Sequence, residues 1–110
     1  VAEICRPLRN DPLAQQAIAQ AARRSGNAEE AVERLGQLAR QTPRDASVLN
    51  NYGNALIDAG RTNEAVEVLR QAFSIDDGKP EIWLNLGRAH SQLEEFDNAL
   101  SAFDRAIALN

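Results

Sequence analysis

The feature that most constrains the fold is a repeat of 34 residues in the second half of the chain. Gly53 and Gly87 are 34 positions apart, and the same spacing relates Leu69 to Phe103. Chains that repeat at a fixed period of about 20–50 residues stack copies of one supersecondary unit, because a single unit cannot bury its own apolar face. The sequence therefore predicts a stack of similar units.

Each unit has the pattern of two helices. In the middle unit Leu49, Tyr52 and Leu56 recur at spacings of three and four, which marks one face of a helix. Gly60 then ends that helix, because glycine takes the left-handed conformation at no steric cost. We therefore predict an all-α protein of six main helices, near residues 12–25, 28–41, 46–59, 62–75, 80–93 and 96–109.

Small side chains indicate how tightly these helices pack. Only 5% of the residues are aromatic, so the core must be built mainly from Ala, Leu, Ile and Val. We expect Gly53 and Gly87 on first helices to face Ala65 and Ala99 on second helices. With no large side chain between the two backbones, each pair of helices would form a closely packed hairpin.

Residues 83–90 read W-L-N-L-G-R-A-H, and Phe103 continues the pattern at the expected distance. This sequence resembles the tetratricopeptide repeat family, whose 34-residue helix-turn-helix units carry a W-x2-L-G-x2-Y…A-x3-F…P pattern. The resemblance implies a right-handed α-solenoid of three antiparallel helix-turn-helix hairpins. Its units are 12–45 (degenerate), 46–79 and 80–110, after an N-terminal cap or the end of a preceding helix at 1–11.

The resemblance also implies a concave groove lined by the first helices, and a protein-protein interaction scaffold that binds an extended peptide or helix there. Amide side chains both donate and accept hydrogen bonds, so they suit a peptide backbone. Asn51 and Asn85 resemble the asparagine ladder of the O-linked N-acetylglucosamine transferase repeats, although such residues also simply solubilise a helix. The predicted groove residues are Gln16, Gln20, Arg23, Asn50, Asn51, Asn54, Asp58, Leu84, Asn85, Arg88 and Gln92.

A second binding mode of the family, capture of a chaperone's C-terminal carboxylate, does not fit this sequence. That mode needs Lys and Asn in early repeats and basic residues in a later one. Gln16 and Gln20 stand at the early positions, and Glu81 at the later one would repel a carboxylate. Arg23 and Arg88 are cations of the predicted groove that could instead pair with an acidic ligand.

Other classes of function have little support in the sequence. The net charge of −4 disfavours a general nucleic-acid surface. His90 is the only histidine and Cys5 the only cysteine, so we predict no metal site, no cofactor and no catalytic group. No apolar run is long enough for a membrane span, and we expect a cytoplasmic protein. Because the chain starts at Val1 without Met, we expect it to be a fragment.

The last predicted helix carries an apolar stripe that would lack a neighbour, formed by Leu100, Phe103 and Ile107. Either more repeats follow in a parent protein, or the chain self-associates through this stripe. The alternative to a peptide-binding scaffold is therefore a spacer or oligomerisation arm attached to a larger enzyme such as a transferase. The partner of the scaffold is a protein or peptide whose identity the sequence does not give.

Overall fold

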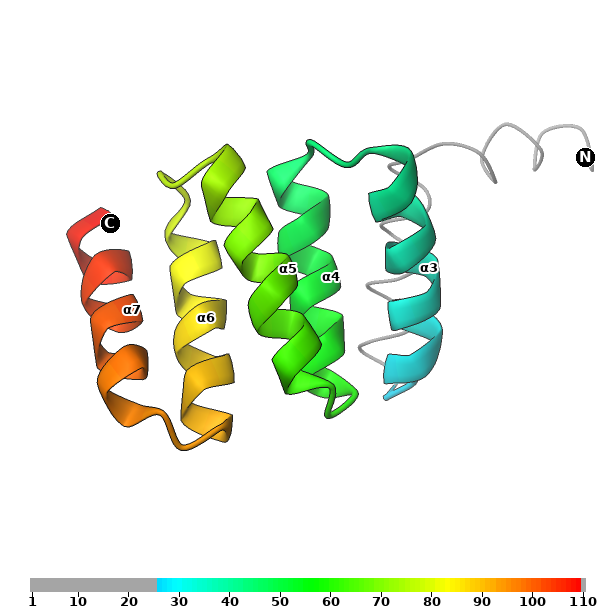
Figure 1. The fold of residues 1–110 in the computed structure, drawn as a ribbon. Coiled ribbons are helices and arrows are strands. Elements are labelled where there is room, and N and C mark those ends of the chain that lie inside the picture. The colour runs from blue at the N-terminus through cyan, green and yellow to red at the C-terminus, as the bar shows by residue number, and fades with distance from the viewer. Residues whose placement is uncertain (1–25, 110) are drawn as a thin grey trace, which may run out of the picture.

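The computed structural model describes residues 26–109, which form five α-helices and contain no strand in that range (Figure 1). The helix predicted at 12–25 and the segment 1–11 lie outside the described residues. The other five predicted helices are confirmed, with ends that differ by at most one residue. They are α3 (Ala28–Gln41), α4 (Ala46–Asp58), α5 (Thr62–Ile75), α6 (Pro80–Gln92) and α7 (Phe96–Leu109).

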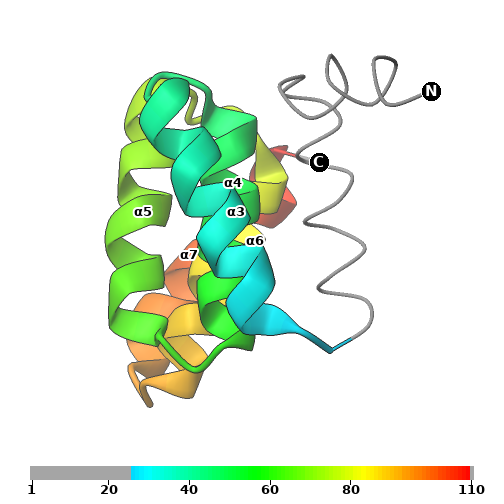
Figure 2. The same cartoon turned by 90° about the vertical axis from the view of Figure 1, so that its right-hand side faces the viewer.

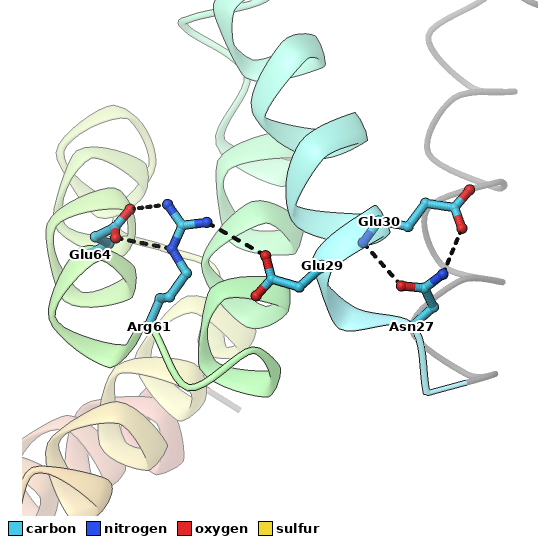
Figure 3. Close-up of polar contacts among 5 residues, drawn as sticks. All are labelled: Asn27, Glu29, Glu30, Arg61 and Glu64. Atoms are coloured by element: carbon cyan, nitrogen blue, oxygen red, sulfur yellow. Dashed lines mark hydrogen bonds and ion pairs between the residues drawn. The ribbon is translucent and has the colours of Figure 1, made fainter.

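Short polar side chains start α3 and α4, and a proline starts α6. The Oδ1 of Asn27 accepts a hydrogen bond from the backbone N–H of Glu30, and its Nδ2 donates to the Glu30 carboxylate over 2.9 Å (Figure 3). Asp45 caps α4 by accepting from two backbone N–H groups of the first turn. Pro80 opens α6 at a position where its missing N–H costs nothing. Local sequence thus fixes where the helices begin.

Three described residues that are spaced by 34 lie in the left-handed region. Gly26 has φ of 86° and Gly60 has φ of 80°. The third member of this series, 34 residues later, is Glu94 with φ of 61°. A side chain with a β-carbon is disfavoured there, so the last turn is built less favourably than the two before it.

The helices pack in chain order, each against the next (Figure 1). In addition α4 contacts α6, whereas among the described helices α5 contacts neither α3 nor α7. Successive first helices therefore approach each other on one side of the stack, and the second helices stand apart on the other side. Figure 2 shows α5 at one edge of the array, on the left of the view, with α4 and α6 further to the right.

The glycines of the first helices face larger partners than we predicted. A β-carbon on Gly53 would lie 2.6 Å from Cγ of Leu69, and one on Gly87 would lie 2.5 Å from Cε1 of Phe103. Leu69 and Phe103, rather than the Ala65 and Ala99 that we expected, therefore supply the nearest side-chain atoms. At both positions glycine makes room for a large side chain of the second helix.

One apolar core runs through the stack. Its largest fully buried side chains come from α3, α4, α5 and α6, and they are Leu35, Leu38, Val48, Leu56, Leu69 and Ile82. Between α5 and α6 the rings of Phe73 and Trp83 are stacked, with centroids 4.6 Å apart. Within residues 26–109, no helix has the length and apolar character that crossing a bilayer would require.

Candidate functional site

The first helices α4 and α6 present a polar surface where they contact each other. We call this surface the inner wall. It consists of the eight predicted groove residues that the structure describes, and seven of them are polar. They are Asn50, Asn51, Asn54 and Asp58 of α4, with Leu84, Asn85, Arg88 and Gln92 of α6. The other predicted groove residues, Gln16, Gln20 and Arg23, lie outside the described residues.

Asn85 links the two helices at the centre of the inner wall. Its Nδ2 donates to Oδ1 of Asn50 over 2.8 Å, and its side chain is only 8% exposed. Asn51 is the residue that lies one repeat of 34 before Asn85. The hydrogen bond goes instead to Asn50, which is one residue further back in the sequence. Asn85, one of the two predicted ladder residues, therefore forms an interhelix bond with Asn50.

Arg88 forms the second link. Its guanidinium donates to the side-chain oxygen of Asn54 and, over 3.3 Å, to that of Asn85. One guanidinium nitrogen also lies 3.6 Å from a carboxylate oxygen of Asp58. The Arg88 side chain is nevertheless 43% exposed, so water or a ligand can reach it from the open side. The Arg88 guanidinium thus contacts the side-chain amides of Asn54 and Asn85 and the carboxylate of Asp58.

The ends of the inner wall differ in character. Gln92 accepts a hydrogen bond from the hydroxyl of Thr62 over 3.0 Å, so its amide oxygen points toward α5. Leu84 is 46% exposed and puts an apolar side chain where the preceding unit has Asn50. The wall therefore combines bonded amides, one reachable cation and one exposed apolar contact.

The links between α4 and α6 were missed at the sequence level, although a signal for one of them exists. Asn54 and Arg88 are 34 residues apart and so occupy the same position of successive first helices. Because successive first helices lie side by side, equal positions become neighbours. The Asn50–Asn85 pair is offset by one further residue and has no such signal.

His90 is a packing residue with one polar contact. It is buried at the end of α6, and its Nδ1 lies 2.8 Å from a carboxylate oxygen of Glu95. Among residues 26–109 no group of three or more His, Cys, Asp or Glu side chains is placed to hold a metal ion. Cys5 lies outside the described residues.

The predicted self-association patch on α7 is only partly exposed. Leu100 and Ile107 are 62% and 71% exposed, and Phe96 and Leu109 are exposed nearby. Phe103 is different, because its ring packs over Gly87 and is partly buried in its own hairpin. Of the three predicted patch residues, Leu100 and Ile107 are therefore the exposed ones, and Phe103 is partly exposed.

An ion pair marks the turn between α4 and α5. The guanidinium of Arg61 makes two hydrogen bonds to the Glu64 carboxylate, of 3.0 and 2.7 Å, and lies 4.0 Å from Glu29 of α3 (Figure 3). The hydrogen bond from Arg61 lowers the pKa of Glu64 below its ordinary value of 4.5. The same bond raises the pKa of Arg61. Both groups are in solvent, so the contact adds little to stability.

The chain is similar to curated proteins over a little more than half its length. It is 38% identical over 61 residues to human tetratricopeptide repeat protein 17, matching 56% of this chain and 5% of that protein. It is 33% identical over 61 residues to a rice protein described as a probable UDP-N-acetylglucosamine–peptide N-acetylglucosaminyltransferase SPINDLY, matching 56% of this chain and 7% of that protein. The chain thus spans a small fraction of both relatives.

Solved structures share the fold at low sequence identity. A crystal structure of MamA superimposes with a TM-score of 0.85 at 16% identity, over 99% of this chain and 64% of that one. The second tetratricopeptide repeat domain of Spaghetti (RPAP3), bound to the HSP90 peptide SRMEEVD, gives 0.84 at 18% identity, over 92% and 94%.

Family models settle the classification. Two models described as tetratricopeptide repeat match residues 17–80 and 56–110, and the first of these alone covers more than half of the chain. The hairpins, their 34-residue period and the glycines that admit a large side chain agree with that match. The chain belongs to the tetratricopeptide repeat family.

Proposed function

We propose that the chain is a protein-binding scaffold whose inner wall holds an extended peptide of a partner protein. The observation that supports this most is the row of amides and one arginine shared by α4 and α6. In this proposal three units, 12–45, 46–79 and 80–110, follow the segment 1–11. They form a right-handed stack, and Gln16, Gln20 and Arg23 extend the wall.

The chemistry of the wall favours a peptide backbone over a highly charged ligand. Asn and Arg side chains that already bond each other can exchange one of those bonds for a peptide C=O or N–H with little net loss. Arg88 keeps an open side, and Leu84 offers an apolar contact for one side chain of the peptide. The wall thus provides donors, acceptors and one anchor along a single line.

The Spaghetti domain has this fold and was solved with an HSP90 peptide that ends in a carboxylate-rich EEVD sequence. We propose a different peptide class for this chain. Glu81 stands on the first turn of α6, near where a basic residue would hold a terminal carboxylate. The ligand is therefore contacted through its backbone rather than through its C-terminus.

The test starts from random peptides displayed on phage and selected on the full chain. An inner-wall variant carrying Asn51→Ala, Asn54→Ala and Arg88→Ala should lose the selected peptides, by about tenfold or more in affinity. A control variant carries Arg44→Ala and Asn63→Ala, two exposed residues away from the wall. Equal binding by wild type, inner-wall variant and control would refute the proposal, provided that circular dichroism shows the same helix content.

A second candidate function is a spacer or oligomerisation arm of a larger protein such as a transferase. The partial match to the rice transferase and the exposed Leu100 and Ile107 favour it. In that case the chain should associate as its concentration rises, and Leu100→Lys with Ile107→Lys should abolish the association in light scattering. Light scattering that shows a strict monomer at high concentration would count against a function as an oligomerisation arm.

A further inference from the structure

A second concave surface lies on the opposite side of the stack from the inner wall. We call it the outer groove. It has a volume of about 230 Å³, between α5 and α7, and α6 supplies its floor. The groove is lined by Arg70 and Phe73 of α5, Trp83, Leu86 and His90 of α6, and Asn98, Ser101, Ala102 and Arg105 of α7.

The floor of the outer groove is aromatic and fixed in place. Trp83 stacks on Phe73 with an angle of 20° between the rings, and its indole N–H donates to the backbone carbonyl of Asp77 over 2.9 Å. The guanidinium of Arg105 lies 5.0 Å from the centre of the Trp83 ring. An apolar side chain that entered the groove would therefore meet a preformed floor, made of the two rings and of the Arg105 guanidinium that lies over the Trp83 ring.

The walls of the outer groove are positively charged. Arg70 reaches it from α5 and Arg105 from α7, and no carboxylate is among its lining residues. Neither arginine forms an ion pair with a carboxylate of residues 26–109, in contrast to Arg34, Arg61 and Arg88, which all do. The chain as a whole has a net charge of −4, so the positive charge of the outer groove is opposite in sign to that of the chain.

The preceding unit does not share this charge. At the corresponding positions of α5, Glu64 and Glu67 stand where the outer groove has Asn98 and Ser101. Arg61 is moreover held by Glu64 and Glu29 (Figure 3). The equivalent of Arg70 in that unit is Gly36, and the equivalent of Arg105 in the unit of α5 is Gln71. The repeat alone therefore does not produce the outer groove's charge.

We propose that the outer groove binds an acidic segment of a partner protein, in which carboxylate side chains flank an apolar residue. The apolar residue packs on Trp83 and Phe73, while the carboxylates pair with Arg70 and Arg105. Arginine is suited to this role because its planar fork bonds a carboxylate through two parallel N–H groups. Asn98 and Ser101 on the rim provide hydrogen bonds for the segment's backbone. This site is separate from the inner wall and does not depend on its function.

The protein carries its own reporter, since Trp83 is the only tryptophan. The probe is the peptide acetyl-Glu-Glu-Leu-Glu-Glu-amide, titrated into the full chain while Trp83 emission is followed. We expect a saturable change, and binding at least about tenfold weaker for the matched peptide in which every Glu is Gln. Arg70→Gln and Arg105→Gln should each weaken binding by about tenfold, whereas the exposed Arg44→Gln should have no effect.

Three results would overturn the proposal. One is equal affinity for the acidic and the amide peptide, or no change in emission with either. Another is loss of binding in the Asn54→Ala, Arg88→Ala variant with full binding in the Arg70 and Arg105 variants, which would assign the peptide to the inner wall. The third is sedimentation that shows a dimer abolished by Arg70→Gln and Arg105→Gln, which would make a second copy of the chain the occupant. Circular dichroism of each variant verifies that the helices remain.

Discussion

The hairpins α4–α5 and α6–α7 are copies of one repeat, yet their residues are buried to different extents. Val66 of α5 is 8% exposed, whereas Leu100, its equivalent on α7, is 62% exposed. The middle hairpin has α3 on one side and α6 on the other. In the part of the chain that the structure describes, α7 has only α6 beside it. The comparison teaches that the repeat pattern selects which residues face a neighbour, and that the neighbour itself decides their burial.

The two hairpins also differ where their own helices turn. Gly60 ends the first helix of the middle hairpin, and Glu94 takes the same left-handed position in the last one. The fully buried Leu56 is replaced by His90, which needs Glu95 as a polar partner. The first change adds backbone strain, and the second puts a polar side chain where the middle hairpin has an apolar one. We therefore expect a gradient of stability along the stack.

The largest effect on stability should come from adding one methyl group at Gly53, and it should exceed the effect of the same change at Gly87. Gly53→Ala would press on the fully buried Leu69 and should destabilise the protein by about 2 kcal/mol, after the gain in helix propensity. Gly87→Ala meets Phe103, which is partly exposed and can move outward, so its cost should stay within about 1 kcal/mol. Urea unfolding measures the loss in free energy of unfolding for each variant. Equal losses would contradict the expected difference between the two hairpins.

The next effect concerns the bond that joins the two hairpins. Asn85→Ala removes the hydrogen bond to Asn50 and one contact of Arg88, and should cost about 1–2 kcal/mol. Asn98→Ala, on the exposed face of α7, serves as the control and should change stability little. A double-mutant cycle of Asn50→Ala and Asn85→Ala should show clear coupling. Strict additivity would mean that the bond between Asn50 and Asn85 does not stabilise the contact between the hairpins.

A smaller effect should follow from exchanging the turn residues. Glu94→Gly relieves a left-handed backbone and should stabilise the chain by roughly 0.5–1 kcal/mol, less than the full strain because glycine loses more entropy on folding. The reciprocal Gly60→Glu should destabilise it by a similar amount. Thermal unfolding of the two single variants tests this. A destabilised Glu94→Gly variant would show that the last turn carries no strain.

The smallest effect is a dependence of stability on pH that comes from the Arg61–Glu64 pair of the middle hairpin. The pKa of Glu64 is lowered by Arg61 in the folded chain, so the unfolded chain takes up that proton first as the pH falls. The stabilisation is therefore complete above the ordinary pKa of 4.5 and disappears as the pH drops through the lowered value. Glu64→Gln should make unfolding less steeply pH-dependent in that acid range. The last hairpin has Glu95 and Asn98 at the equivalent positions, and Asn98→Asp should not create the same dependence.

Much of the fold was predictable from sequence because the features that set it are local and periodic. The 34-residue spacing predicted the helices α4 to α7, Gly60 and Pro80 predicted helix ends, and the apolar spacing predicted buried faces. The partners of Gly53 and Gly87 were not predictable in this way. A one-dimensional pattern identifies small residues, but only the geometry of the hairpin shows that they meet Leu69 and Phe103.

The candidate sites were predictable only in part. The position of the inner-wall residues follows from the repeat. The bond between Asn50 and Asn85, however, depends on the relative position of α4 and α6 along their axes, which the repeat does not give. The outer groove was missed altogether. Its arginines come from α5 and α7, which do not contact each other, and α6 separates them in sequence. No spacing rule connects residues that share only a cavity.

Amide hydrogen exchange along the full chain tests the stack most directly, because each helix reports its own opening free energy. Our account predicts the slowest exchange in α4 and α5, which have neighbours on both sides, and exchange at least about tenfold faster in α7. Equal protection of α5 and α7 would contradict it, since the last hairpin would then be as stable as the middle one without a second neighbour among the described helices.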